Sequence, residues 1–174
     1  MKVLAIGASN SRNSINQALA KYAANSVKGA EVNVVDLNEF EMPIFSEDRE
    51  KELGSPQQAQ QFFKLIGNSD LIVISFAEHN GSYTAAYKNV FDWTSRIDMK
   101  VFQGKAVIML ATSPGPGGAK SVLMMAENSA PYFGAEVLGT ISLASFYDNF
   151  DFESGKVVDS EFNKKLADVI ETLN

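Results

Sequence analysis

Small polar side chains gather in the segment Gly7–Asn16 (GASNSRNSIN), directly after an apolar run near the start of the chain. A plain turn needs one or two such residues, whereas this segment places six serine and asparagine side chains around one cation, Arg12. Backbone N–H groups at the start of a helix favour an anion, and an arginine adds a full charge with bidentate geometry. The pattern predicts a phosphate site, with Ser14 capping a helix beside a solvated turn as the simpler alternative. The segment lacks the GK[ST] of a Walker A loop and the G-x-G-x-x-G of a dinucleotide fingerprint.

Two further loops combine glycine with polar or ring-bearing side chains. The segment AEHNGSY contains, in consecutive positions, Glu78, His79, Asn80 and Gly81. Gly81 permits a positive φ, which would turn backbone amides inward toward a flat heterocycle. In TSPGPGG, the glycines at 115, 117 and 118 leave room for a ligand ring to approach the main chain. A lone histidine is more often a surface residue, and a Pro-Gly run is more often an ordinary turn, so both alternatives stay open.

The predicted strands and helices alternate along the chain, and this alternation indicates where the three loops lie in the fold. Apolar, β-branched runs predict five strands, at Lys2–Ile6, Glu31–Leu37, Leu71–Phe76, Ala106–Ala111 and Glu136–Ile141. Amphipathic patterns predict helices at Ser14–Val27, Gln57–Ile66, Tyr83–Ile97, Lys120–Tyr132 and Glu161–Leu173, the last capped by Asp159 or Ser160. The alternation predicts an α/β fold with a parallel sheet, helices on both of its faces, and the second strand at an edge. Ligands bind beyond the carboxyl ends of such strands, and the three loops follow the first, third and fourth.

Composition favours an ordinary globular protein of one domain, residues 1–174. The net charge of −6 disfavours nucleic acid and anionic membrane surfaces as partners, because their phosphates would be repelled. The absence of cysteine excludes disulfides, thiolate catalysis and Cys-ligated metals, and it suits a reducing cytoplasm. No run approaches the ~20 apolar residues of a membrane span. The acidic segment Asp148–Glu153 fails the EF-hand spacing, so we expect a solvated loop there and no metal site.

Two segments indicate contacts beyond the sheet. Residues 40–56 form a long, charged excursion bounded by prolines, whose apolar residues indicate a lid, a subunit contact or a packed loop. In the helix predicted over 83–97, one apolar stripe covers the sheet, and Trp93 helps to widen it toward a second side. A second subunit would cover that side; the alternative is that Trp93 lies under a neighbouring loop.

Together, the three loops resemble the NAD(P)H-dependent FMN reductase family of flavodoxin-like folds, which includes bacterial quinone, chromate and azo-dye reductases. The family's G-S-x-R-x-x-S-x-N motif corresponds, with inserts, to Gly7, Ser9, Arg12, Ser14 and Asn16. Its P-E-Y-N-G-S and K-N-x-x-D-W motifs correspond to Ala77–Ser82, Lys88-Asn89 and Asp92-Trp93. Its S-x-G-x-x-G-G motif corresponds loosely to Ser113–Gly118, and the assignment of Gly117 versus Gly118 stays open. The match spans essentially the whole chain and implies a three-layer sandwich with strand order 2-1-3-4-5.

The resemblance implies that FMN carries the chemistry, so no catalytic side chain is expected. The residues it implies for cofactor binding are Ser9, Arg12, Ser14, Ile15 and Asn16 at the phosphate, and Glu78, His79, Asn80, Gly81, Ser113, Gly115 and Gly117 around the ring. It further implies NAD(P)H as reductant, a quinone, azo compound or similar small molecule as acceptor, and a homodimer or homotetramer. Ala77 and His79 stand where the family has proline and tyrosine, which changes the stacking surface beside the flavin.

Two alternatives to an FMN-dependent oxidoreductase stay open. A flavodoxin-type electron carrier would bind the same cofactor, but such carriers usually hold phosphate without an arginine and are more acidic than this chain. A relative of the fold that has lost flavin and serves in regulation or interaction is compatible with Ala77 and His79. The sequence contains no identifiable 2′-phosphate site, so it does not separate NADH from NADPH.

Overall fold

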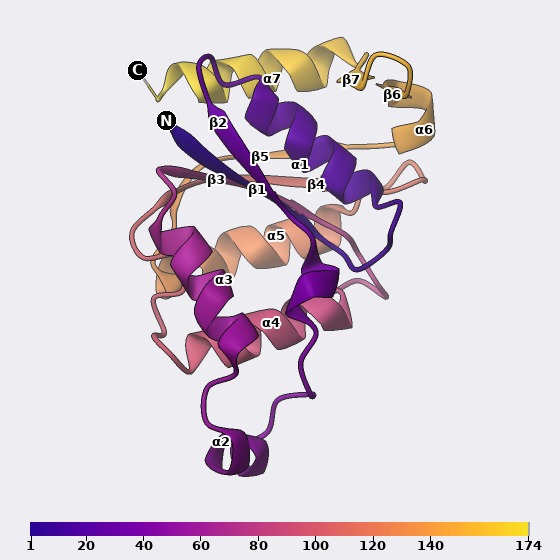
Figure 1. Cartoon of the computed structure of the whole chain (residues 1–174). Helices are drawn as coiled ribbons and strands as arrows, with labels where there is room; N and C mark the ends of the chain where they lie inside the picture. The colour runs from indigo at the N-terminus through magenta and orange to yellow at the C-terminus, as the bar shows by residue number, and fades with distance from the viewer. Residues whose placement is uncertain (174) are drawn as a thin grey trace.

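A five-stranded parallel sheet lies at the centre of the molecule in the computed structural model, which describes residues 1–173 (Figure 1). The strands are β1 (Lys2–Ala8), β2 (Glu31–Val35), β3 (Leu71–Phe76), β4 (Ala106–Thr112) and β5 (Glu136–Leu143). They pair in the order β2-β1-β3-β4-β5, and every pair is parallel. The predicted strand order and the edge position of the second strand are confirmed.

Helices cover both faces of this sheet, as predicted. One face carries α1 (Ile15–Asn25) and α7 (Ser160–Glu171), and the other carries α3 (Gln57–Gly67), α4 (Ala85–Ser95) and α5 (Lys120–Ser129) (Figure 1). The short elements are η1 (Leu37–Phe40), α2 (Glu47–Leu53), η2 (Ala130–Phe133), α6 (Phe146–Asn149), β6 (Phe150–Asp151) and β7 (Lys156–Val157). Within residues 1–173, no helix combines the length and the apolar character needed to cross a bilayer.

Alternate side chains of the central strands enter two separate hydrophobic cores. On β1, Val3 and Ala5 pack with α1 and α7, whereas Leu4 and Ile6 pack with the helices of the opposite face. All four side chains are at most 1% exposed. A parallel sheet covered on both faces has no solvated side, which explains why these strands read as continuous apolar runs.

Side-chain caps set where α1, α4 and α7 begin. The hydroxyl of Ser14 accepts the backbone N–H three residues further on at 3.1 Å, and α1 begins directly after it. Thr84 caps α4 in the same way at 3.2 Å, so this helix begins two residues later than the predicted Tyr83. Asp159, one of the two predicted caps, accepts the corresponding N–H of α7. Each cap satisfies a donor that the first helical turn would otherwise leave unpaired.

Two sequence predictions are wrong for local reasons. The second strand ends two residues early, at Val35, because the Asp36 carboxylate caps η1. The segment Asp148–Glu153 is not simply a solvated loop. Phe150 is buried and stacks on Phe146 with ring centroids 4.7 Å apart, and β6 pairs antiparallel with β7. Its carboxylates and Phe152 face solvent, but Phe150 belongs to the core on the α1 face.

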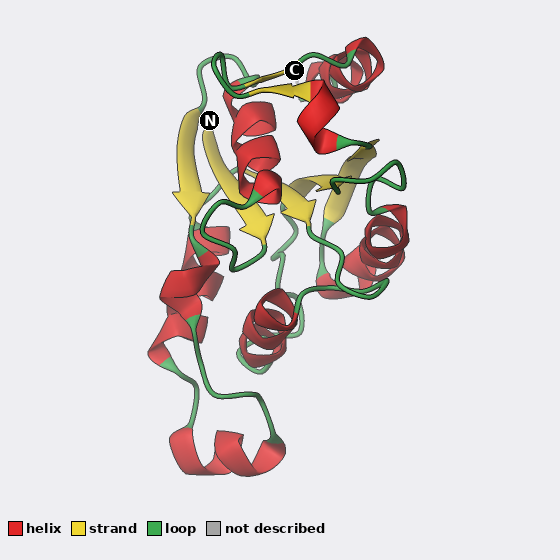
Figure 2. Ribbon diagram, turned by 90° about the vertical axis from the view of Figure 1, so that its right-hand side faces the viewer, coloured by secondary structure: helices red, strands yellow, loops and turns green. Residues whose placement is uncertain are grey.

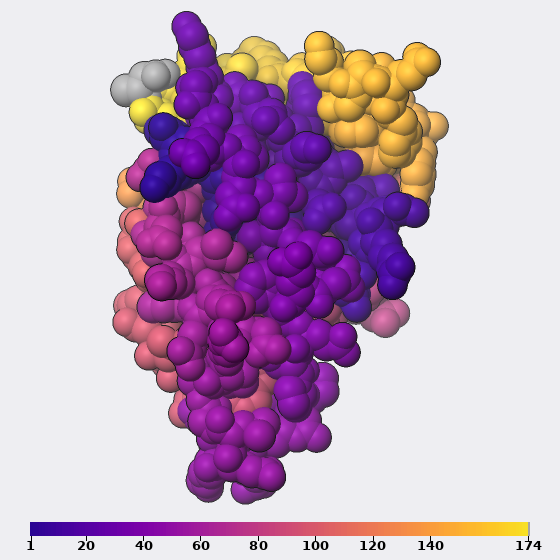
Figure 3. All heavy atoms as spheres, in the orientation of Figure 1, coloured from indigo at the N-terminus to yellow at the C-terminus, as the bar shows by residue number. Residues whose placement is uncertain are grey.

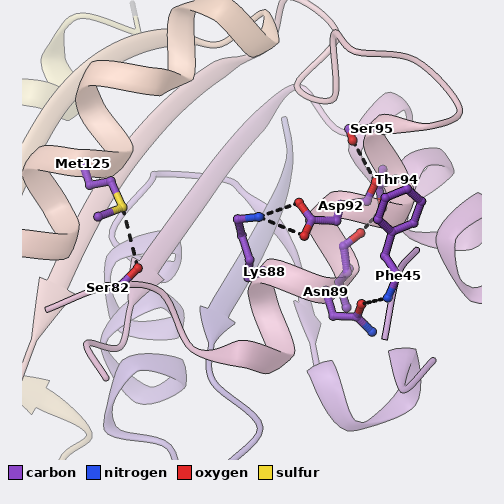
Figure 4. Close-up of polar contacts among 9 residues, drawn as sticks. Phe45, Ser82, Lys88, Asn89, Asp92, Thr94, Ser95 and Met125 are labelled. Atoms are coloured by element: carbon purple, nitrogen blue, oxygen red, sulfur yellow. Dashed lines mark hydrogen bonds and ion pairs between the residues drawn. The ribbon is translucent and has the colours of Figure 1, made fainter. Parts of the chain in front are cut away.

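Residues 40–56 divide into a packed loop and a projecting helix. Trp93 Nε1 donates to the Pro43 carbonyl at 2.7 Å, and the Phe45 ring lies edge-on to the indole at a centroid distance of 5.1 Å. Asn89 Oδ1 accepts the Phe45 N–H at 2.9 Å (Figure 4). Helix α2 has no buried side chain, and it forms the narrow end of the molecule, away from the sheet (Figures 2 and 3).

These contacts correct the interpretation of α4. Trp93 is 0% exposed and is covered by residues of its own chain, so it offers no surface to a second subunit. The wide apolar arc of α4 has two partners in this chain, the sheet on one side and the loop before α2 on the other. The alternative, that Trp93 lies under a neighbouring loop, is the correct one.

Candidate functional site

The three polar loops meet at the carboxyl edge of the sheet. In Figure 1 they lie on the right-hand side of the molecule, and Figure 2 looks onto this edge. They surround a cleft of about 250 Å³ lined by Ser9, Ser11, Asn13, Ser14, Ile15, Asn16, Ala77, Glu78, His79, Thr112, Ser113, Pro114 and Tyr147. Of the residues implied by the sequence, the cleft therefore brings together Ser9, Ser14, Ile15, Asn16, Glu78, His79 and Ser113. Its lining does not include Arg12, Asn80, Gly81, Gly115 or Gly117.

The first loop presents hydroxyl groups and helix N–H groups to this cleft. Ser9 Oγ accepts the Ser11 N–H at 3.1 Å, which holds the loop in a tight turn ahead of α1. With the Gln17 N–H taken by the Ser14 cap, the earlier N–H groups of the first turn have no partner within the helix. Arg12 is exposed on the same loop, and no ion pair within the described residues involves it. This end of the cleft has the donors and the positive potential that suit an anion.

Asn16 points away from this end of the cleft and into the protein. Its side chain is buried, and its Oδ1 accepts the Ser75 hydroxyl at 2.7 Å and the Thr112 N–H at 3.3 Å. Its Nδ2 donates to the Thr112 carbonyl at 3.3 Å. The amide group therefore ties the start of α1 to the ends of β3 and β4.

The second loop is a two-residue turn between His79 and Ser82. The backbone N–H of each residue donates to the carbonyl of the other, at 3.0 and 3.2 Å. Asn80 and Gly81 take φ values of +53° and +78°, which confirms the predicted positive φ at Gly81. The N–H groups of these two tip residues take no part in the reciprocal pair. His79 is exposed at the rim of the cleft.

Glu78 connects the second loop to the third. Its Oε2 accepts the Val122 N–H at 3.0 Å, in the first turn of α5. That helix has no side-chain cap of its own, because Ala119 stands at the capping position with φ +55°. Glu78 therefore caps α5 from another loop, and a carboxylate at this end also complements the helix dipole.

The third loop contains glycines with different structural roles. A Cβ added to Gly115 or Gly117 would meet no atom within 4 Å, so both have open space beside them. Gly118 has φ +60°, and a Cβ there would collide with the Ser142 hydroxyl. The backbone thus requires glycine at 118, whereas 115 and 117 are free to face a ligand.

The loop after β5 also reaches the site, which the sequence analysis missed. The N–H of Ser145 donates to the Gly115 carbonyl at 2.9 Å, and that of Phe146 to the Ser113 carbonyl at 3.0 Å. These bonds bring Tyr147 to the cleft. The sequence could have indicated this contact, because Tyr147 follows the fifth strand closely and the loops after parallel strands lie at the same carboxyl edge.

A second hollow, of about 290 Å³, lies between α4 and α5. Its walls are mainly aromatic and thioether side chains, among them Phe76, Tyr83, Phe91, Met125 and Phe133. Ser82 Oγ donates to Met125 Sδ at 3.8 Å at one end, and the Lys88–Asp92 ion pair of 2.8 Å lies beside it (Figure 4). Burial raises the pKa of the Tyr83 hydroxyl, and this effect outweighs the opposing hydrogen bond with Ser129.

Comparisons with known proteins give the same fold and a family. A family model described as NADPH-dependent FMN reductase matches residues 1–148. FerB, a flavoenzyme NAD(P)H:(acceptor) oxidoreductase from Paracoccus denitrificans, superposes with a TM-score of 0.76 at 21% identity, covering 98% of this chain and 93% of that one. This similarity and the strand order identify the fold as flavodoxin-like.

Two related proteins align with most of this chain, and one of them is named for an enzymatic activity. An uncharacterised protein of Mycoplasma pneumoniae is 26% identical over 159 residues, covering 87% of this chain and 92% of that protein. The NAD(P)H:quinone oxidoreductase of Solanum tuberosum is 30% identical over 125 residues, covering 70% of this chain. That alignment spans 63% of the potato enzyme, which is less than two thirds of its length.

Proposed function

Because the chain belongs to the NADPH-dependent FMN reductase family, we propose that it binds FMN in the cleft at the carboxyl edge and transfers reducing equivalents from NAD(P)H to a small acceptor. Residues 1–174 would form one FMN-binding domain. The observation that carries the proposal is that a helix start suited to an anion and two glycine-bearing loops line one cleft, inside the segment that the family model matches. The potato relative's name supports a quinone as the acceptor class.

The donors at the first loop fit the phosphate of FMN. A phosphate ester needs several hydrogen-bond donors and positive potential, and the hydroxyls of Ser9, Ser11 and Ser14, the start of α1 and Arg12 supply both. Ser9, Ser14 and the backbone of Ile15 and Asn16 would hold the phosphate inside the cleft. Arg12, outside the lining, would reach it from the rim.

The other two loops fit a flat ring that remains open to solvent on one side. His79 and Ser113 line the cleft, and the tip amides of Asn80 and Gly81 follow His79 in the chain. Gly115 and Gly117 leave space for a ring edge. When bound, FMN supplies the redox chemistry by accepting hydride from the nicotinamide and passing electrons to the acceptor. The chain's own task is to position the reactants, which agrees with a site holding one histidine and no cysteine.

The deciding experiment is binding followed by turnover. Apoprotein titrated with FMN should become yellow with a defined stoichiometry, and the complex should oxidise NADH or NADPH when a quinone is present. Protein that binds FMN but oxidises neither nucleotide would instead be an electron carrier, to be tested with protein donors. Protein that stays colourless in excess FMN would contradict the proposal.

We also propose that the chain self-associates through the face formed by α4 and α5. The hollow between these helices is apolar, and Met125, which lines it, exposes 39% of its surface, while its neighbour in α5, Met124, exposes 61%. Exposed apolar groups of this kind mark protein contact surfaces. Light scattering should give a mass of two or four chains, and Met125→Lys should lower it. The mass of one chain at micromolar concentration would exclude self-association.

A further inference from the structure

Tyr147 is an exposed aromatic residue that is held in place by backbone hydrogen bonds before it and by aromatic contacts of its ring. It is 60% exposed on α6, yet it lines the same cleft as the first three loops. Among the described residues that line this cleft, it has the only benzene ring. Its side chain therefore offers a ligand in the cleft an exposed benzene ring to pack against.

The backbone before Tyr147 is bonded to the site. The Ser145 and Phe146 N–H groups donate to the third loop, and Asn149 Nδ2 donates to the carbonyls of Ala144 and Ser145 at 3.0 and 3.3 Å. Ser145 itself has φ +46°, a conformation that non-glycine residues adopt at an energetic cost. Such strain persists where surrounding contacts enforce it, and it clusters at ligand sites.

The Tyr147 ring is also fixed by its aromatic neighbours. The ring of Phe146, 0% exposed, meets it edge-on at a centroid distance of 5.7 Å. Phe152 stacks alongside at 6.1 Å with an interplanar angle of 23°. Since Phe152 is itself exposed, the pair keeps aromatic surface in water at the mouth of the cleft. A ligand lying in the cleft would cover part of that surface.

We propose that Tyr147 is a cofactor-binding residue, whose ring packs against FMN as the wall contributed by the fifth strand's loop. This inference rests on the proposed function and adds a contact that the three-loop resemblance does not contain. A ring held in place before binding loses little entropy on contact, so its apolar area contributes directly to affinity. Aromatic packing of this kind is removed by alanine but kept by phenylalanine.

The test measures FMN affinity of the apoprotein by equilibrium titration, together with iodide quenching of bound flavin. Tyr147→Ala should weaken FMN binding about tenfold and open the flavin to iodide, whereas Tyr147→Phe should stay within twofold of wild type. Tyr132→Ala, equally an exposed tyrosine but outside the cleft, is the matched control and should change neither quantity. Equal losses for Tyr147→Phe and Tyr147→Ala would overturn ring packing.

Phe152→Ala separates direct contact from loosening of the aromatic cluster. We expect this variant to lose less affinity than Tyr147→Ala, because Phe152 supports the ring without lining the cleft. An equal loss would assign the effect to the cluster and overturn the inference. If wild-type apoprotein binds FMN and Tyr147→Ala binds it as tightly, only this inference fails. If wild type binds no FMN, the proposed function fails with it.

Discussion

Asn16 and Thr112, 96 residues apart in sequence, are joined by two hydrogen bonds through a single amide group. Asn16 donates to the Thr112 carbonyl and accepts its N–H, both at 3.3 Å, and it also accepts the Ser75 hydroxyl. Thr112 Oγ1 in turn donates to the Leu143 carbonyl at 2.7 Å. This buried chain of bonds fixes the ends of three strands relative to the start of α1, and with them the shape of the cleft.

Replacing Asn16 should therefore cost stability. Asn16→Ala leaves the Ser75 hydroxyl and the Thr112 backbone without buried partners, and we expect a loss of about 2–3 kcal/mol. Urea unfolding measures the change. Asn13→Ala, an exposed residue of the same loop, is the control and should stay within ~0.5 kcal/mol of wild type. Equal stability of the two variants would mean that the amide bridge is not formed.

Glu78 should stabilise the protein by capping α5, in addition to any contact that it makes with a ligand in the cleft. Glu78→Ala removes the acceptor of the Val122 N–H, so we expect a loss of about 1 kcal/mol and faster hydrogen exchange in the first turn of α5. Glu78→Gln keeps an acceptor oxygen without the charge and should restore part of the protection. Exchange rates unchanged in both variants would argue against the cap.

A variant of Arg12 distinguishes the contribution of this charge to FMN binding from that of the hydroxyl groups in the same loop. If its guanidinium contacts the phosphate, Arg12→Ala should weaken FMN binding by about 1–3 kcal/mol. The remaining affinity should depend less on salt, because one charge-assisted contact is gone. Lys28→Ala, an exposed cation beyond the opposite end of α1, serves as control. Wild-type FMN affinity in Arg12→Ala would remove this residue from the site.

Stability should fall at alkaline pH because of Tyr87. Burial raises the pKa of its hydroxyl well above the ordinary value of 10.0, and the neighbouring Tyr83 adds to this. The folded state thus keeps a proton that the unfolded chain releases. The stabilisation is complete below pH 10 and is lost as pH rises from there toward the folded-state pKa. Urea unfolding across this range should show a shallower decline for Tyr87→Phe, and identical declines would contradict the assignment.

Short-range patterns predicted the layered fold because strand periodicity, glycine positions and caps are local properties. Ser14 and Asp159 illustrate this, since each caps the helix that follows it by accepting a backbone N–H three residues further on. The side-chain partners within the site are different. That Glu78 reaches Val122, or that Asn16 turns inward, depends on how segments 44 and 96 residues apart are placed. Tyr147 was missed for the same reason, since only its backbone bonds to the third loop bring it to the cleft.

Helix α2 has a practical consequence for handling the protein. It buries no side chain, and its described ion pair with the body is the one between Glu50 and Arg96. Foreign peptide placed in such a segment disturbs little, because hardly any packing depends on it. An epitope or a fluorophore attached near Glu52 would therefore mark the molecule at the far end from its cleft. Immobilisation through that point would leave the carboxyl edge of the sheet open to small molecules.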